Sequence, residues 1–361
     1  MQEKEKQLFK ALCKFKDTFA DAFLAKHATP TVLGHLFFNR MQGVAYDTLK
    51  RNGLLGKVPR EFRNALLAAY EQNTQKNASF RTCVAKLSDL LRACDCKVAM
   101  LKGAYLCAHY PEGYRTSNDI DLLVSPKDVT SIGNLLSSLG FMQGNVRNGE
   151  FIPATRKEII ESKMLRGETV PYIKEVNLPF MRFLEVDINY SLDYKNGNGD
   201  TVSEMLSRAC MKDEGALSIP TLDDADFFLH LCAHLYKEAT TLPWVEMQRD
   251  MTLYKYADIY LLLSEMSEEQ LRHIFTRARR LGLEKVCAYA ILETVGLFDM
   301  DAPLADALSR TALAQDPSFR LRVVSPADKR VLWYTTPDVS ERFFMESRAK
   351  DLKEVKESAS T

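Results

Sequence analysis

The segments that decide the fold of this chain are KVAMLKGA at residues 97–104 and RTSNDIDLLV at residues 115–124. Apolar and acidic residues alternate in the second segment, which predicts a buried strand. Successive side chains of a strand point to opposite faces, so Asp119 and Asp121 should share one face, roughly 7 Å apart. Two like charges on one face are unfavourable unless a cation lies between them.

A pair of carboxylates on one strand face suits metal chemistry. Carboxylate oxygens are ligands that hard ions such as Mg²⁺ prefer, and two such ions about 3.5–4 Å apart serve in-line phosphoryl or nucleotidyl transfer. The first segment has the form of a strand that runs into a glycine turn and a helix, where backbone N–H groups can hold phosphate. The alternative is structural: the two acids lie at a strand edge and are paired with Arg or Lys.

These motifs also carry a resemblance. Lys102-Gly103-Ala104 followed by Asp119-Ile120-Asp121 resembles the signature of the DNA polymerase beta-type nucleotidyltransferase superfamily. The sequence patterns LKG and RxxxDIDLLV resemble more closely those of a bacterial subfamily of largely uncharacterised members, usually labelled only "nucleotidyltransferase family protein". The sequence departs from the superfamily pattern in two ways, because Ala104 stands where Ser is common and the spacer to Asp119 is slightly long.

The resemblance implies a site for a nucleotide and metal ions. Asp119 and Asp121 would hold two Mg²⁺ ions, with Mn²⁺ as the alternative metal. Because Ala104 has no hydroxyl, the phosphates would be held by the backbone at Gly103 and Ala104 together with the side chains of Lys102 and Arg115. The co-substrate implied is an NTP, with ATP binding as the expectation, or a nucleotide-sugar.

A second strand with an acidic face is predicted at residues 183–192, FLEVDINYSL. The superfamily carries a third carboxylate on a later strand of the same sheet, and Asp187 is the candidate here. Glu185 is the competitor because it lies on the same face. Asp187 is favoured because it lies in the middle of the strand, flanked by apolar residues. Its expected role is to share a metal ion and to accept the proton of the attacking hydroxyl.

Residues 221–298 are predicted to be helical, and they contain a possible second group of site residues. His230 and His234 are four residues apart and share a helix face. The stretch HLCAH lacks the catalytic Glu of the zinc-protease motif. Either the histidines are hydrogen-bonded core residues, or His234 and Lys237 face the metal cleft and contact substrate or phosphate. This region resembles the same subfamily, so the resemblance covers about residues 60–265.

The fold class predicted is α+β: a minimal nucleotidyltransferase core, with a small mixed sheet and helices, flanked by N- and C-terminal helical regions. The segments expected are an N-terminal helical region at 1–93, the core at 94–210, a C-terminal helical domain at 211–315 and an extension at 316–361. Residues from about Arg348 are expected to fray. Residues 144–182 are polar and irregular, and form either a solvated surface or a basic flap. The basic residues of the segment 144–182 are Arg147, Arg156, Lys157, Lys163 and Arg166.

The composition of the chain limits the classes of partner that we expect it to bind. The 361 residues include 48 Lys and Arg against 48 Asp and Glu, so no excess of positive charge favours long nucleic acid. The eight cysteines have no zinc-type spacing, the N-terminus lacks a signal-peptide pattern, and no apolar run reaches the roughly 20 residues of a membrane span. We therefore expect a cytoplasmic protein with reduced thiols and no membrane partner.

The leading functional hypothesis is a Mg²⁺-dependent transferase. It would move an NMP from an NTP to a hydroxyl or phosphate of a small-molecule or peptide/protein acceptor and release pyrophosphate. One alternative is sugar transfer from a nucleotide-sugar to a peptide or small acceptor in the same metal cleft. Another is a non-catalytic regulatory or toxin–antitoxin-type module, which the absence of Ser at position 104 would favour and the retained carboxylates would not.

Overall fold

The computed structural model describes residues 1–15, 22–165, 167–192 and 199–354. Contacts divide the chain into two compact units. The sheet unit comprises Gln42–Asp47 and Arg60–Phe227, and the helical unit comprises Met1–Met41, Thr48–Pro59 and Phe228–Thr361. The helix α4 (Gln42–Arg51) is divided between the two units.

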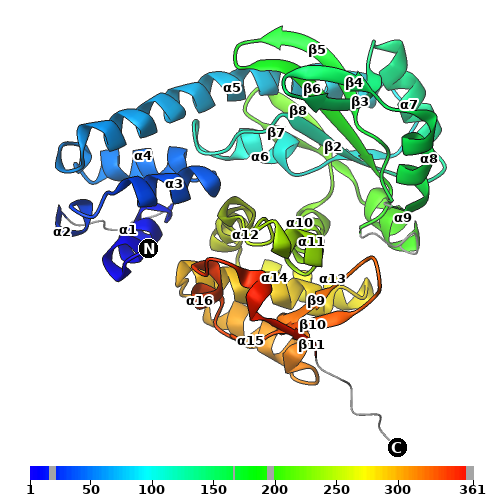
Figure 1. Ribbon diagram of the computed structural model, residues 1–361. Coiled ribbons are helices and arrows are strands. Elements are labelled where there is room, and N and C mark those ends of the chain that lie inside the picture. Colours follow the sequence, from blue (N-terminus) through cyan, green and yellow to red (C-terminus); the bar gives the residue numbers. More distant parts are fainter. Residues whose placement is uncertain (16–21, 166, 193–198, 355–361) are drawn as a thin grey trace, which may run out of the picture. The chain divides into compact units, whose positions relative to one another are not determined.

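The sheet unit is built on a six-stranded mixed sheet with the order β1-β2-β6-β5-β3-β4 (Figure 1). The strands are β1 (Val98–Met100), β2 (Asp119–Val124), β3 (Met142–Arg147), β4 (Glu150–Pro153), β5 (Tyr172–Leu178) and β6 (Met181–Asn189). The pair β2 and β6 is parallel, and each of the other neighbouring pairs is antiparallel. A separate hairpin is formed by β7 (Cys210–Glu214) and β8 (Leu217–Thr221). This mixed sheet with helices confirms the predicted α+β class.

Three helices pack on the apolar side of this sheet: α5 (Arg60–Arg92), α6 (Gly103–His109) and α7 (Val129–Ser138). The sheet unit also contains α8 (Arg156–Leu165) and α9 (Gly199–Ser207). The helix α5 is continuous over 33 residues, and it includes the polar residues Asn77 and Ser79 in its buried part. Ser79 is buried in the helix, and its hydroxyl donates a hydrogen bond to the carbonyl of Pro179, so this polar residue is accommodated without a break.

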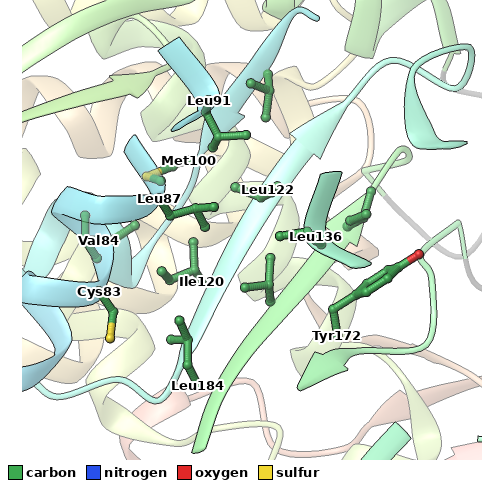
Figure 2. Packing of buried hydrophobic residues seen from close by; sticks show 14 of the residues in the cluster. Cys83, Val84, Leu87, Leu91, Met100, Ile120, Leu122, Leu136, Tyr172 and Leu184 are labelled. Atoms are coloured by element: carbon green, nitrogen blue, oxygen red, sulfur yellow. The ribbon is translucent and has the colours of Figure 1, made fainter. Parts of the chain in front are cut away.

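The apolar face of β2 lies in the core of the sheet unit. Ile120 and Leu122 are fully buried, and the apolar stripe of α5 and Leu136 of α7 pack in the same cluster (Figure 2). Burying an aliphatic side chain of this size contributes about 1.5–3 kcal/mol. Because strand side chains alternate, burial of this face directs Asp119 and Asp121 to the other face of the sheet.

The helical unit contains most of the remaining helices. They are α1 (Glu3–Leu12), α2 (Ala22–Ala25), α3 (Pro30–Phe38), α10 (Asp224–Ala239, which begins in the sheet unit), α11 (Leu242–Glu246), α12 (Leu253–Glu265), α13 (Glu268–Arg280), α14 (Glu284–Phe298), α15 (Pro303–Ala312) and α16 (Val339–Phe343), with 3-10 turns at Leu55–Lys57, Pro317–Leu321 and Arg348–Asp351. A three-stranded sheet is formed by β9 (Arg322–Val324), β10 (Val331–Tyr334) and β11 (Leu352–Glu354). No helix among the described residues has the length and apolar character needed to cross a membrane.

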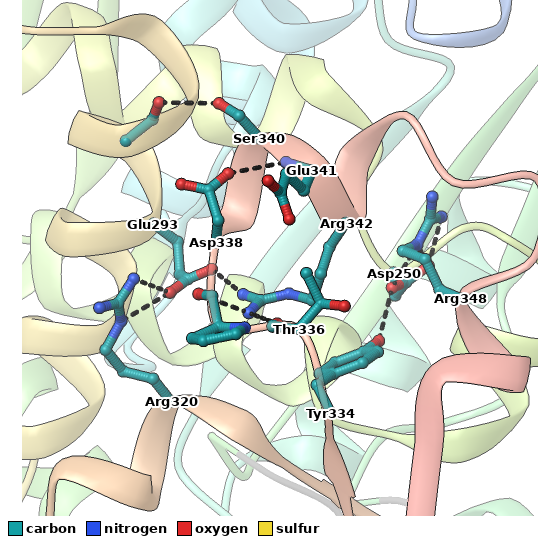
Figure 3. A network of polar contacts seen from close by, with 12 residues as sticks. Asp250, Glu293, Arg320, Tyr334, Thr336, Asp338, Ser340, Glu341, Arg342 and Arg348 are labelled. Carbon is teal, nitrogen blue, oxygen red and sulfur yellow. Dashed lines mark hydrogen bonds and ion pairs between the residues drawn. The ribbon is translucent and has the colours of Figure 1, made fainter.

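Buried ion pairs hold the C-terminal segment within the helical unit (Figure 3). Arg342 of α16 pairs with Glu293 of α14 at 2.5 Å. Arg348 donates from Nε and Nη2 to the carboxylate of Asp250, with N···O distances from 2.6 to 3.0 Å. The expectation that the chain frays from about Arg348 was therefore wrong for Arg348–Glu354, because a buried charge pair and the pairing of β11 order this stretch. The last residues, 355–361, lie outside the described part of the chain.

The segments expected from the sequence do not coincide with the two units. Residues 60–92, expected in an N-terminal helical region, belong to the sheet unit because α5 supplies one wall of its core. Residues 211–227, expected in the C-terminal helical domain, also belong to the sheet unit. Here the Thr221 hydroxyl donates to the carbonyl of Met100 at 2.6 Å, which ties β8 to β1.

Candidate active site

The site is built on the parallel pair of strands at the centre of the sheet. In the register of β2 and β6, Asp121 lies opposite Asp187 and Asp119 lies opposite Glu185. Neighbouring strands are about 4.8 Å apart, so four carboxyl groups crowd onto one face of two strands. Alternation along each strand keeps these acids on the face away from the buried core residues Ile120 and Val186.

Crowding changes the acidity of the β6 carboxyl groups. Burial, together with repulsion from Asp121, Glu185 and Asp119, raises the pKa of Asp187 well above its usual range. Burial and the nearby Asp119 and Asp121 raise the pKa of Glu185 to about 7. Both shifts have the same physical origin, because a carboxylate in a poorly solvated place beside other carboxylates is less stable than the neutral acid. Repulsion among the carboxyl groups on this face therefore favours the neutral form of Glu185 and Asp187 unless further positive charge lies close by.

Lys102 provides positive charge at the centre of this group. Its Nζ donates to Oδ1 of Asp121 at 2.8 Å, and Asn189 Nδ2 lies 3.4 Å from the same oxygen. Burial alone would lower the pKa of Lys102, but the carboxylates of Asp121, Asp119 and Asp187 outweigh burial and raise it. The Lys102 side chain is 16% exposed and that of Asp121 is 8% exposed, so solvent screens the ion pair only weakly.

The backbone at Lys102 adopts a conformation that favours glycine. Its φ is 43° and its ψ is −114°, at the turn between β1 and α6. A residue with a side chain in such a region costs roughly 1–3 kcal/mol, and such residues gather at functional sites. Lys102 is thus strained in its backbone and also donates a hydrogen bond to Asp121 from its ammonium group.

Gly103 follows in the same turn and has no space beside it. A Cβ at Gly103 would lie 2.8 Å from Oγ of Ser117 and 2.9 Å from Nη1 of Arg115. Arg115 and Ser117 therefore contact the turn directly. Ser117 also donates a hydrogen bond to the carboxylate of Asp119. Burial tends to raise the pKa of Asp119, but the bond from Ser117 and the charges of Lys102 and Arg115 outweigh burial and lower it.

Sequence reasoning missed Ser117 and Asn189. The strand period of two would have found both, because Ser117 is two residues before Asp119 and Asn189 is two residues after Asp187. The structure brings together Lys102, Gly103 and Arg115 with the acids on β2 and β6. Ala104 is buried, and its N–H donates to the carbonyl of Leu101 at 3.1 Å. Binding of phosphate by the Ala104 backbone stays a prediction.

The carboxyl groups of β2 and β6 do not form a complete set of metal ligands in this structure. In the part of the chain that the structure describes, no three His, Cys, Asp or Glu side chains are arranged so that they could hold a metal ion together. Two of the acids are engaged by other groups: Lys102 contacts Asp121, and Ser117 contacts Asp119. Asp119, Asp121 and Asp187 do carry the hard oxygen ligands that a divalent cation prefers, and binding of a metal ion by these three residues stays a prediction.

The second group of expected site residues lies on α10, in the helical unit. His234 Nε2 lies 3.5 Å from Oε1 of Glu238, and Lys255 of α12 pairs with the same carboxylate. Lys237 is half-buried on α10. These contacts place His234 in a charged cluster within its own unit. Contact of His234 and Lys237 with a substrate or phosphate stays a prediction.

The basic segment at 144–182 contains the hairpin of β3 and β4, followed by α8 and β5. Of its basic residues, Arg147, Arg156, Lys157 and Lys163 are exposed, and Arg166 lies outside the described residues. Lys157 pairs with Glu161 one helical turn away. These side chains lie on the surface, and their function as a flap over a ligand stays a prediction.

Comparison with known proteins identifies the class of protein. Residues 30–299 match the model of a family described as uncharacterised nucleotidyltransferases, and the chain belongs to this family. The predicted resemblance to nucleotidyltransferases is confirmed. No curated protein matches the chain.

Six chains of solved structures match. One is the crystal structure of an antigenic nucleotidyltransferase-like protein from Paracoccidioides brasiliensis, with 14% identity and a TM-score of 0.32. The match covers 56% of this chain and 90% of that chain.

Proposed function

We propose that this chain transfers an NMP from an NTP to a hydroxyl or phosphate of a small-molecule or peptide/protein acceptor and releases pyrophosphate. Its family supports nucleotidyl transfer as the general activity. The observation that carries the proposal is the register that sets Asp121 opposite Asp187, beside the turn at Lys102 and Gly103. This combination of clustered acids and a basic turn suits a ligand that contains both phosphate and metal.

The basic residues at the turn would bind the phosphates. Arg115 Nη1 lies against Gly103, where a guanidinium can donate two parallel hydrogen bonds to a phosphate. Lys102 supplies a second positive charge within the same turn. Because Gly103 has no Cβ, the guanidinium of Arg115 can lie close to the backbone of the turn.

The acids would act on the acceptor and hold the metal. Asp119, Asp121 and Asp187 would bind Mg²⁺, which when bound supplies positive charge to the reacting phosphate. Asp187 would accept the proton of the attacking hydroxyl at its carboxylate, from its position opposite Asp121 in the middle of β6. Ser117 would orient Asp119 through its hydrogen bond.

Calorimetric titration tests the nucleotide site. ATP, GTP, CTP, UTP and a nucleotide-sugar would each be titrated with and without Mg²⁺ into the wild type, Asp119→Asn and Asp121→Asn. Asp224→Asn is the matched control, because Asp224 is an exposed acid of the same unit that pairs with Lys212. We expect Mg²⁺-dependent binding of one nucleotide that is lost in the two site variants and kept in the control. Binding that is absent, or equal in all four proteins, would refute the proposal.

Product analysis separates the chemical alternatives. An NTP labelled at the α-phosphate would be incubated with the chain and candidate acceptors, and a nucleotide-sugar labelled in the sugar would be run in parallel. Transfer of the α-label with release of pyrophosphate supports nucleotidyl transfer. Transfer of the sugar label with release of a nucleoside diphosphate would replace it with glycosyl transfer. Nucleotide binding without either product would favour the non-catalytic module.

A further inference from the structure

We propose that Lys102 is a built-in counter-cation that occupies Asp121 until nucleotide arrives, so that divalent-metal binding depends on nucleotide binding. This inference rests on the proposed function of the same site. It assigns to Lys102 a positioning role in the nucleotide-free protein, beyond the phosphate contact expected from the sequence. Two observations carry it: the contact that Lys102 makes with Asp121, and the position of Lys102 in the turn between β1 and α6.

The first observation is that Lys102 contacts the carboxylate oxygen that a metal ion would need. Lys102 Nζ lies 2.8 Å from Oδ1 of Asp121, and Asn189 Nδ2 lies 3.4 Å from that oxygen. A Mg²⁺ ion would bind a carboxylate oxygen at about 2.0–2.1 Å. An ammonium group and a divalent cation on the same carboxylate would repel each other strongly, because little solvent screens them there. Lys102 must therefore leave Asp121, at least in part, when a metal binds.

The second observation is that Lys102 stands in the turn proposed for the phosphates. Its backbone φ of 43° is uncommon for a residue with a side chain, and the turn continues directly into Gly103. The ammonium group of a lysine is carried on a flexible four-carbon chain. It can therefore move from a carboxylate to a phosphate without a change in the backbone. The nucleotide would thus supply the anion that replaces Asp121 as partner of Lys102.

The same arrangement explains how the acids are tolerated without a metal. Four carboxyl groups face one another on β2 and β6, and Lys102 offsets part of their repulsion. If the ammonium moves to the nucleotide phosphates, the acids are left to a divalent cation. Nucleotide and metal then favour each other's binding, and this coupling is reciprocal by thermodynamic necessity.

Manganese binding measures this coupling directly. Free Mn²⁺ would be quantified by electron paramagnetic resonance as protein is titrated, with and without a non-hydrolysable analogue of the NTP that the calorimetry identifies. Metal that binds the analogue alone is measured separately and subtracted. The variant is Lys102→Met, which removes the charge and keeps an unbranched side chain at the strained position. The matched control is Lys212→Met, which removes a lysine of similar exposure that pairs with Asp224 in the same unit.

In the wild type we expect weak Mn²⁺ binding without nucleotide and a clear gain with it. Lys102→Met should bind Mn²⁺ roughly fivefold or more tightly than wild type without nucleotide, within the usual range of coupling between sites, and nucleotide should then add little. Lys212→Met should behave as wild type. Lys102→Arg, which retains the charge, should keep Mn²⁺ binding weak in the absence of nucleotide.

Other results would overturn the inference. In the Asp121→Asn background, Lys102→Met should no longer change Mn²⁺ affinity, so a persisting effect would contradict competition at Asp121. An Mn²⁺ affinity in Lys102→Met equal to or below that of wild type would also contradict it. If both proteins bind nucleotide and Mn²⁺ with the same coupling, only the role of Lys102 fails. If the wild type binds neither ligand, this inference and the proposed function fail together.

Discussion

At the scale of single residues, the turn at Gly103 is the position where one added atom should matter most. A Cβ there would meet Oγ and Cβ of Ser117 and Nη1 of Arg115 at 2.8–2.9 Å. The end of an arginine side chain can move away easily. Ser117 is shorter and would have to shift at its own Cβ, which would disturb the hydrogen bond that it donates to Asp119. The effect of a small substitution would thus reach both the proposed phosphate site and an acid.

We therefore predict that Gly103→Ala weakens nucleotide binding. Loss of one hydrogen bond to a charged group costs about 1.5–3 kcal/mol, which corresponds to roughly 10–100-fold in affinity. The measurement is calorimetric titration of the NTP with Mg²⁺. Gly34→Ala is the control, because a Cβ at Gly34 on α3 meets nothing within 4 Å. Equal nucleotide affinity in both variants and the wild type would show that the turn does not contact the nucleotide.

The two acids of β6 can be separated by substitution at the same scale. Asp187 lies opposite Asp121, whereas Glu185 lies opposite Asp119 at the start of β2. We predict that Asp187→Asn lowers kcat of nucleotidyl transfer roughly 10²–10⁴-fold, the usual contribution of a general base, and that Glu185→Gln lowers it less. Neither change should destabilise the fold, because each replaces a carboxyl group on a crowded acidic face with a neutral amide of similar size. A larger loss in Glu185→Gln would make Glu185 the third carboxylate.

At the scale of elements, the C-terminal segment depends on charge pairs in a poorly solvated place. Arg342 of α16 and Glu293 of α14 are buried, and Arg320 lies 2.6 Å from the other oxygen of Glu293. A carboxylate in the interior needs such partners, since an unpaired buried charge is strongly unfavourable. The contact between α14 and α16 should therefore be specific rather than only apolar.

We predict that Arg342→Met lowers the free energy of unfolding by about 3 kcal/mol, the lower part of the range for breaking a buried pair, because Arg320 still faces Glu293. The measurement is denaturant unfolding followed by circular dichroism. Arg310→Met is the control, since Arg310 forms an exposed pair with Asp306 that is worth less than about 1 kcal/mol. A small effect at Arg342, no larger than that at Arg310, would mean that apolar packing alone holds α16.

The element scale also explains the position of the site in the sheet. The parallel pairing of β2 and β6 places two acidic stripes side by side, and β1 carries the turn of Lys102 and Gly103 to the neighbouring edge of β2. The N–H of Leu101 donates to the carbonyl of Asp121 at 2.9 Å, so the turn begins directly beside this acid. Backbone pairing rather than side-chain contact thus sets the distance between the basic turn and the acids.

At the scale of the whole molecule, contacts divide the chain into two units, and the acids and the basic turn of the proposed site belong to the sheet unit. We predict that Mg²⁺ and the bound NTP slow amide hydrogen exchange in β2, β6 and α6. At 100 times the dissociation constant, a ligand stabilises its site by about 2.7 kcal/mol, which sets the upper limit of the gain. Mass spectrometry of peptic fragments measures it, with Asp121→Asn as control.

Unchanged exchange in β2 and β6 would contradict a nucleotide site on these strands. Slower exchange in α10 would support the role predicted for His234 and Lys237. The three-stranded sheet of β9, β10 and β11 provides an internal reference within the helical unit, since no proposed ligand contact lies on it.

The sequence alone determined the family, the α+β class and the shared face of Asp119 and Asp121, because alternation along a strand is a local property that needs no knowledge of the rest of the fold. Tertiary structure decided what local pattern cannot. The register of β2 and β6 sets Asp187 opposite Asp121, and Lys102, which lies in a turn with a positive φ, contacts the carboxylate of Asp121. Tertiary contacts also place α5 in the sheet unit, and the pairing of β11 gives Arg348–Glu354 an ordered structure. These features depend on pairing between residues far apart in sequence, whose register and burial exist only after the chain has folded.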